Sequence, residues 1–436
     1  MKFMSARRAI STGIVAAASV AALVAPGAAN AALPGHCKGI TTEGAGSSLQ
    51  AEAQAIWDPG FEVNKVGCPA GPKVTYRSIG SGAGYKEWNE KEHFGTVGFV
   101  GTDNTVNQAE KESVEKKATL GTSTLETIPV LQGAVSIDVN LPAECSATST
   151  IAANRLALND STLEEIYAGK ITNWNELNNV ENAGNKLTGA GCNSAITAVV
   201  RKDGSGTTHI FKRFLNEIFN GVLASEDGLN HTWGELAEGS LSTKWPTAAK
   251  VLHAAEETGP GLLKTVAATP GSIGYANLAD ARNVANGGFT GQSASRFWVE
   301  LEASKKSKNG KTTRKYTDPS TNGDSATVSA SNCKDTVYSN GSAAFPPPAV
   351  SSPWNEVTAE TTSKTYALCG LTYDLVLTNY EAYTGGSAGE AQSVVDFENY
   401  VLSKKGGQKE IKNKDYNELP KGLVSESLEG VEKITG

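Results

Sequence analysis

The stretch VRKDGSGTTHIF, residues 200–211, decides the fold, because it places an arginine, an aspartate and a run of small residues between a strand-like and a helix-like segment. Glycine loses more conformational freedom on folding than any other residue, so such a cluster needs a reason. A plain turn is one interpretation. A backbone cradle for an anion is the other, since the first N–H groups of a helix have no internal partner and the helix dipole is positive there.

Two earlier stretches share this design of strand, small-residue loop and helix: EGAGSSLQ at 43–50 and RSIGSGAG at 77–84. Glycine lets an anion approach the backbone closely, and hydroxyl groups add donors. A turn explains each loop alone, whereas three such loops favour convergence on one anion. The chain has no Gly-x-x-x-x-Gly-Lys-Ser/Thr run, and the glycines at 80–84 lack the dinucleotide spacing. The loops therefore predict a site for a bare oxyanion, with Arg201 as its one full positive charge.

Asp103, in FVGTDNT at 99–105, is an unusual residue to find beside an anion. A carboxylate repels a fully ionised ligand but accepts a hydrogen bond from one that carries a proton. Phosphate is protonated at neutral pH and sulfate is not, so Asp103 would favour phosphate. The alternative is that Asp103 caps a turn. Asp203 either orients the guanidinium of Arg201 or caps its own loop.

The first 31 residues have the features of a secretory signal peptide. Lys2, Arg7 and Arg8 precede an apolar stretch at 10–24, and Ala-Asn-Ala at 29–31 fits a cleavage site. A retained anchor helix is the less favoured alternative, because the apolar part is short. No lipobox precedes Cys37, so we expect a soluble protein outside the cell, without a lipid anchor.

Net charge and cysteine content narrow the range of partners and cofactors that the protein could bind. The net charge is −7, and it becomes −10 when the three cations of the signal peptide are removed. Such a chain disfavours nucleic acid and acidic membranes as partners. An even number of cysteines in an exported chain favours three disulfides over a metal site, and the five histidines are scattered. We expect no cofactor. Proximity alone favours the sequential pairs Cys37–Cys68, Cys145–Cys192 and Cys333–Cys369.

Alternating strand-like and helix-like segments predict an α/β protein. The strands include residues 73–79, 127–142 and 369–381, and a helix is expected over roughly 149–158. Residues 293–363 are rich in Ser, Thr, Asn, Lys and Pro. We interpret them as a polar insertion that contains a hairpin at most and is tethered through Cys333.

Taken in order, the motifs resemble the substrate-binding proteins of phosphate ABC transporters. The resemblance rests on Gly-Ala-Gly-Ser-Ser at 44–48, Ile-Gly-Ser-Gly at 79–82, Gly-Thr-Asp at 101–103, Arg-x-Asp-Gly-Ser-Gly-Thr at 201–207 and Gly-Ser-Ile-Gly-Tyr at 271–275. It implies a two-lobed periplasmic-binding-protein-like fold (type II) with the ligand in the cleft between the lobes. The first lobe would comprise residues 32–126 and 276–436, including the insertion, and the second lobe 127–275.

The resemblance also implies the ligand contacts and the biology. Asp103 would accept the ligand proton, and Arg201, supported by Asp203, would pair with the anion. The remaining contacts would be Ser48, Leu49, Ser81, Ser205, Gly206 and Thr207. A monomer would bind inorganic phosphate for uptake and deliver it to a membrane permease. The family often has Thr-Phe where this chain has Ser48-Leu49, and its members lack the long insertion.

Three other functions compete with phosphate binding. The first is the binding of another oxyanion, where Asp103 disfavours sulfate and arsenate stays open. The second is a surface protein that keeps the fold without transport. The least favoured is a secreted hydrolase: GGSAG at 385–389 matches a nucleophile elbow, but no histidine follows His253 to complete a triad. We therefore expect no enzymatic activity.

Overall fold

The computed structural model describes most of the chain after residue 31. The described residues are 32–89, 97–104, 106–149, 155–179, 184–218, 222–224, 230–237, 242–246, 253–290, 295–309, 311–321, 330–339, 354, 357–360 and 365–436. The predicted signal peptide lies outside this part of the chain. Within it, no helix is long and apolar enough to cross a membrane.

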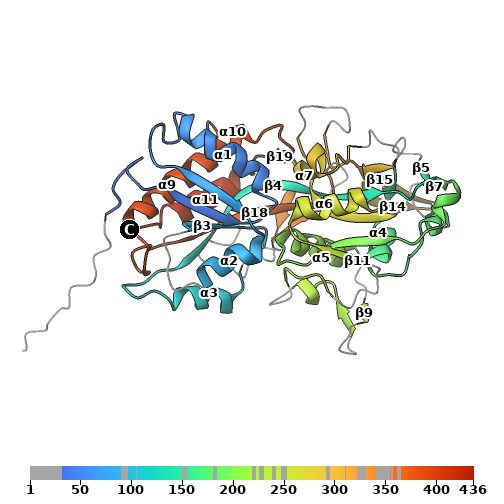
Figure 1. The fold of residues 1–436 in the computed structure, drawn as a ribbon, viewed down its shortest axis with the longest axis horizontal. Helices are drawn as coiled ribbons and strands as arrows, with labels where there is room; N and C mark the ends of the chain where they lie inside the picture. Colours follow the sequence, from blue (N-terminus) through green and yellow to red (C-terminus); the bar gives the residue numbers. More distant parts are fainter. Residues whose placement is uncertain are drawn as a thin grey trace, which may run out of the picture.

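A ten-stranded sheet runs through both halves of the molecule, with eight strands in the order β11-β8-β12-β4-β18-β3-β1-β2. Two long strands, β4 (Leu125–Asn140) and β18 (Cys369–Leu377), pass between two lobes that lie side by side (Figure 1). Residues 125–134 of β4 pair with β18, and residues 135–140 pair with β12 (Ser272–Asn277). All sixteen residues of β4 are buried, which fits its largely apolar sequence.

The first lobe surrounds the strands β1 (Thr42–Gly46), β2 (Val74–Ser78) and β3 (Phe99–Thr102). Stacked and edge-on aromatic rings, among them Phe61, Phe99 and Phe397, fill its core. Its helices are α1 (Ala51–Val63), α2 (Ser81–Asn89), α3 (Gln108–Glu115), α9 (Ala388–Leu402), α10 (Gly407–Glu410) and α11 (Lys421–Val431), with the short strand β19 (Tyr416–Asn417) pairing with β4.

The second lobe surrounds β8 (Thr197–Arg201), β11 (His253–Glu256) and β12. Its aromatic core includes Tyr167, Phe211, Trp245 and Tyr275. Its helices are α4 (Asp160–Tyr167), α5 (Gly206–Ile218), α6 (Gly259–Ala268) and α7 (Leu278–Arg282). Two small ribbons, β5 (Ser146–Thr148) with β7 (Lys186–Thr188) and β9 (Val222–Ala224) with β10 (Asn230–Thr232), complete it.

The pairing of the polar insertion differs from two predictions, one about the lobe it packs on and one about a helix at 149–158. Strand β13 (Arg296–Trp298) pairs with β4 at 138–140, and β14 (Glu300–Lys308) pairs with β6 (Ala157–Leu158). This part of the insertion therefore packs on strands of the second lobe, although we assigned it to the first. The helix predicted over 149–158 is also wrong at its C-terminal end. Residues 157–158 form strand β6 there, because β14 provides a pairing partner for that segment. Residues 150–154 lie outside the described residues.

The insertion does contain the expected hairpin. It is formed by β14 and β15 (Lys311–Thr317), and a second small ribbon joins β16 (Val337–Ser339) to β17 (Thr358–Glu360). Three disulfides join the sequential pairs that proximity favours: Cys37–Cys68, Cys145–Cys192 and Cys333–Cys369. The last one ties the insertion to β18 between the lobes.

Candidate functional site

The three small-residue loops meet where the two lobes face each other (Figure 1). Each loop leaves the carboxyl end of a strand, β1, β2 or β8, and enters the helix that follows, α1, α2 or α5. Ligands of open α/β sheets bind at this edge of the strands. The loops of β1 and β2 belong to the first lobe, and the loop of β8 belongs to the second.

Glycine allows the two lobes to approach at this point. A Cβ on Gly206 would lie 2.7 Å from the amide nitrogen of Asp103 and 2.7 Å from Ser81 Oγ, which is closer than such atoms pack. Across the same boundary, the Gly82 N–H donates to the Gly204 carbonyl at 3.0 Å. The glycines of the third loop therefore bring its backbone against the first lobe.

Asp103 is a buried carboxyl group that is hydrogen-bonded from both lobes. It follows β3, is 3% exposed, and accepts hydrogen bonds from three hydroxyl groups. Ser47 and Thr372 (2.9 Å) donate to Oδ1, and Thr207 of the second lobe donates to Oδ2 at 3.1 Å. Burial raises the pKa of Asp103, while these hydrogen bonds and the charge of Arg201 oppose the rise.

Arg201, at the end of β8, is 3% exposed. Its Nε donates to Asp203 Oδ1 at 2.6 Å and its Nη2 donates to Asp203 Oδ2, which makes a bidentate pair. Its Nη1 donates to Ser48 Oγ of the first lobe at 3.2 Å. The structure thus places Asp203 as the group that orients the guanidinium.

Ser48 and Ser81 have the same arrangement of hydrogen bonds. Ser48 Oγ accepts from Arg201 and from the first N–H of α6, at Gly259 (3.2 Å). Ser81 Oγ accepts from the N–H groups of Gly206 (3.2 Å) and Asp103 (3.3 Å). Because a hydroxyl oxygen has two lone pairs and one hydrogen, each serine keeps its O–H to donate. Both side chains are 2% exposed.

The other predicted contacts lie in the same place, with their backbone donors engaged. The Leu49 N–H donates to Ser47 Oγ at 3.0 Å, and the Ser205 N–H donates to the Thr243 carbonyl at 2.9 Å. Ser205 Oγ accepts from the Thr208 N–H at 3.2 Å in the first turn of α5. All eight predicted ligand residues are buried and gathered at this boundary. Their contact with an anion stays a prediction.

The sequence analysis missed three residues that hydrogen-bond to the predicted ligand residues. Ser47 lies in the recognised Gly-Ala-Gly-Ser-Ser motif, where its role could have been considered. Gly259 lies in Thr-Gly-Pro-Gly, whose Pro after a potential cap is a helix-start signal. Thr372 lies in the middle of β18, and only the pairing of β18 with β3 brings it to Asp103.

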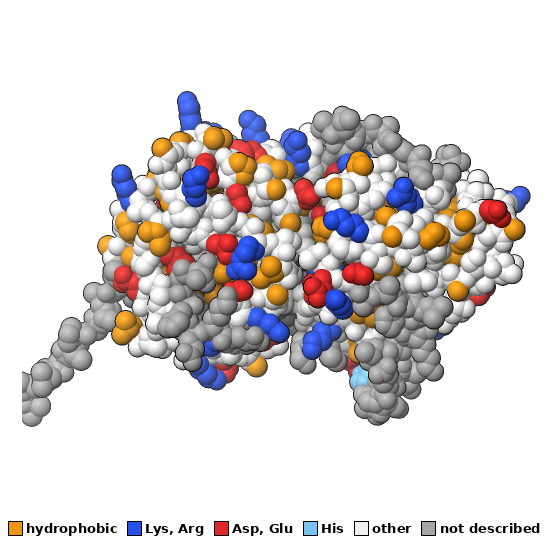
Figure 2. All heavy atoms as spheres, viewed as in Figure 1, with side chains coloured by type: hydrophobic (Ala, Val, Ile, Leu, Met, Phe, Trp, Pro, Cys, Tyr) orange, Lys and Arg blue, Asp and Glu red, His pale blue; other side chains and the backbone are white. Residues whose placement is uncertain are grey.

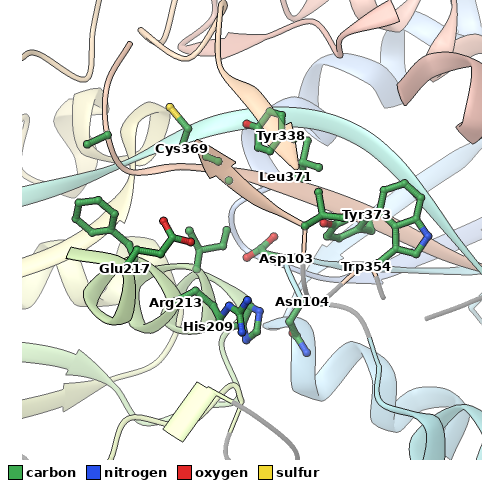
Figure 3. A pocket seen from close by; sticks show the side chains of 16 residues that line it. Asp103, Asn104, His209, Arg213, Glu217, Tyr338, Trp354, Cys369, Leu371 and Tyr373 are labelled. Atoms are coloured by element: carbon green, nitrogen blue, oxygen red, sulfur yellow. The ribbon is translucent and has the colours of Figure 1, made fainter. Parts of the chain in front are cut away.

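A separate small cavity adjoins Asp103 on the side of the insertion (Figure 3). It is lined by α5, by β18 and by Tyr338 and Trp354 of the insertion, and Trp354 packs edge-on against Tyr373 with ring centroids 5.9 Å apart. Its volume is about 40 Å³, which is room for about three water molecules. Asp103 is the one predicted ligand residue on its wall, so this cavity is distinct from the cradle.

Two further features of the described residues concern surface charge and a group of potential metal ligands. On the face drawn in Figure 2, positive and negative side chains of the described residues intermingle. His36, Cys37, Cys68 and Asp396 lie within metal-ligand range of one another. Both cysteines form a disulfide, however, and a disulfide sulfur is not a thiolate ligand.

Comparison with known proteins gives consistent matches. The family model of the PBP superfamily domain matches residues 21–341. A phosphate-binding protein PstS of Pasteurella multocida is 29% identical over 247 residues, which is 56% of this chain and 58% of the relative. PstS 3 of Mycobacterium tuberculosis is 29% identical over 209 residues, 48% of this chain and 50% of the relative. The matched region thus spans between half and three-fifths of these relatives.

Solved structures agree on the fold. A high-affinity periplasmic phosphate-binding protein, PfluDING, bound with phosphate, has a TM-score of 0.59 at 19% identity and covers 88% of this chain and 92% of its own. A phosphate-binding protein from Stenotrophomonas maltophilia has a TM-score of 0.58 at 19% identity and covers 89% and 93%. The predicted two-lobed α/β fold is confirmed.

Proposed function

Because the chain belongs to the PBP superfamily, we propose that it is a non-catalytic solute-binding protein that holds one inorganic phosphate ion between its lobes. The observation that carries the proposal is the environment of Asp103. A carboxylate offers about four lone-pair positions. Three of them accept hydrogen bonds from Ser47, Thr372 and Thr207, so one acceptor position is left for a proton that the ligand brings.

Donors for the other oxygens surround this acceptor. Among the described residues, the hydroxyl hydrogens of Ser48 and Ser81 have no acceptor, and each oxygen already accepts two hydrogen bonds. The N-termini of α2, α5 and α6 begin at these residues or their partners, so their positive dipole ends face the same space. One acceptor among several donors suits an oxyanion that carries one proton, as phosphate does at neutral pH.

Asp203 neutralises most of the charge of Arg201, and this shapes the selectivity. A bare cation would attract sulfate as readily as phosphate. A guanidinium whose Nε–Nη2 edge is already paired with a carboxylate offers its remaining N–H donors with little net charge. Discrimination then depends on whether the ligand can donate to Asp103.

Ligand binding between the lobes would favour the closed state. In the described part of the chain, the hydrogen bonds that cross the boundary at the cradle include Thr207 to Asp103, Arg201 to Ser48, Gly259 to Ser48, Gly206 to Ser81 and Gly82 to Gly204. An ion that contacts both lobes binds the closed form better than an open one, and so shifts the population toward it.

The similar proteins described as phosphate-binding support a place in phosphate uptake for this chain. In our proposal the protein works outside the cytoplasmic membrane as a monomer, after removal of residues 1–31, and hands phosphate to the permease of an ABC transporter. Its first lobe would comprise residues 32–126 and the chain that returns from β18 onward. Its second lobe would comprise 127–275 together with α7 and β13–β15.

Calorimetric titration of the protein, stripped of anion, with phosphate and then with sulfate tests the proposal. We expect tight binding of phosphate and no heat from sulfate. Arg201→Ala should weaken phosphate binding by about 1.5–3 kcal/mol through loss of a charge-assisted hydrogen bond. A wild-type protein that binds neither anion would refute the function, and an Arg201→Ala variant of unchanged affinity would move the site elsewhere.

A further inference from the structure

Asp280, in the short helix α7, is a buried acid without a partner. Its side chain is 1% exposed, and neither carboxyl oxygen has a hydrogen-bond partner among the described residues. Buried polar atoms are almost always hydrogen-bonded, because leaving a group unsatisfied costs about 1–3 kcal/mol. The unpaired carboxyl therefore calls for a physical explanation.

The carboxyl of Asp280 lies beside the cradle. A Cβ on Gly259 would stand 2.6 Å from Asp280 Oδ2 and 3.7 Å from Ser48 Oγ, so these two oxygens are at most about 6.3 Å apart. Two groups that hydrogen-bond to one oxygen atom can lie up to about 6 Å apart, and two that bond to different oxygens of one ion can lie farther. Asp280 and Ser48 can therefore contact the same oxyanion.

The charges around Asp280 favour its neutral form. Burial raises its pKa well above the usual value, and Glu52 and Asp103 raise it further, while Arg201 opposes the rise. Asp138 and Tyr416 are also within electrostatic reach. A neutral carboxylic acid has an O–H to donate, whereas a second carboxylate would repel the anion.

Asp280 is not the only buried acid with unsatisfied oxygens, but its surroundings differ. Asp138 accepts from Ser136 Oγ at 3.0 Å. Asp374 and Glu398 also have no hydrogen-bond partner for either carboxyl oxygen among the described residues, but they interact with each other, and that interaction shifts the pKa of both. Asp280 differs in its position beside Ser48 and the first N–H of α6.

We propose that Asp280 is a further ligand contact, whose carboxylic acid donates a hydrogen bond to the bound phosphate on the side of Ser48 and Gly259. The inference rests on the proposed function. The loaded site then holds two protons between carboxyl groups and the ion: one at Asp103, brought by the ligand, and one at Asp280, supplied by the protein. If the proton of Asp280 transfers along its hydrogen bond to the ion, the total number of protons in the site stays the same.

Two substitutions of similar size separate this role from a structural one. Asp280→Asn keeps a neutral N–H donor, whereas Asp280→Leu keeps the volume and removes every polar atom. We expect the Asn variant to bind phosphate within about threefold of wild type, and the Leu variant to bind about 10- to 100-fold more weakly. Because Leu also removes an unsatisfied polar group, the melting temperature of the ligand-free Leu variant should be equal or higher.

Glu390→Gln is the matched control, because Glu390 is also a buried acid with an unpaired oxygen, on α9 away from the site. Its phosphate affinity should equal that of wild type. Equal affinity of the Asn and Leu variants, whether both strong or both weak, would overturn the role of Asp280 while leaving phosphate binding in place. A wild-type protein that does not bind phosphate would instead refute the function on which the inference rests.

Discussion

Replacing Gly206 with alanine should separate ligand affinity from stability. Gly206 opens α5 in the second lobe, and the three atoms nearest to a Cβ placed there are all in the first lobe. They are Asp103 Cβ, Asp103 N and Ser81 Oγ, each at 2.7 Å. Two of the three belong to Asp103 close to its backbone, so no flexible side chain can simply turn away. The lobes themselves must separate.

The size of the effect follows from these distances. Ordinary contact begins near 3.4 Å, so the lobes must move apart by about 0.7 Å. The bonds from Thr207 to Asp103 (3.1 Å) and from the Gly206 N–H to Ser81 (3.2 Å) then exceed hydrogen-bonding range. Losing one charge-assisted and one neutral hydrogen bond destabilises the closed state by about 2–4 kcal/mol, which lowers phosphate affinity roughly 30- to 1000-fold.

The assay is calorimetric titration with phosphate together with thermal unfolding of the ligand-free protein. Alanine is a better helix former than glycine by up to about 1 kcal/mol, so the variant should unfold at an equal or higher temperature. Gly261→Ala is the matched control, because Gly261 lies in the first turn of α6 and its Cβ would meet only Thr258 Oγ1, at 3.4 Å. Wild-type affinity in Gly206→Ala would refute the closed geometry as the binding state.

Three further predictions concern selectivity, pH and the insertion. Asp103→Asn removes the acceptor for a ligand proton, so the preference for phosphate over sulfate should fall at least about tenfold in a competition titration; an unchanged ratio would contradict that role. Burial raises the pKa of Glu390 to about 7, so its protonated form is favoured by folding. The stability of wild type relative to Glu390→Gln should therefore fall by about 3 kcal/mol as the pH rises from below 4.5 to above 7, as measured by urea unfolding of both proteins. Replacing both Cys333 and Cys369 with serine should cost about 2–4 kcal/mol, since their disulfide closes a loop over a sequence separation of 36; an unchanged urea midpoint would show that the insertion is held without it.

The cradle could be predicted from the sequence because its parts are local. A loop of small residues between a strand and a helix fixes where N–H groups and hydroxyls point, so 43–50, 77–84 and 200–207 could be recognised one at a time. The pairing of Asp203 with Arg201 is equally local, over two residues. Such features need only the backbone conformation of a few neighbouring positions.

The remaining features depend on contacts between distant segments. Thr372 reaches Asp103 only because β18 pairs with β3, over 269 positions of sequence. Nothing in the sequence around Asp280 marks it as a site residue, and its position beside Ser48 and Gly259 is visible only in the structure. For the same reason, the sequence does not show that the β14 part of the insertion pairs with β6, because β6 is two residues long and carries no signal of its own.

The charges of the site show how a chain of net charge −7 would hold the proposed dianion. Arg201 is matched by Asp203, and Asp103 adds a negative charge, so side-chain charges alone would repel the ligand. The attraction must come from dipoles: the N-termini of α2, α5 and α6 and the two free hydroxyl hydrogens, all buried where water does not screen them. An ionised Asp280 would upset this balance, whereas a neutral one adds a donor. In the proposed site, buried dipoles and retained protons would thus take the place of a cluster of lysines at an exposed site, and they would also discriminate between oxyanions.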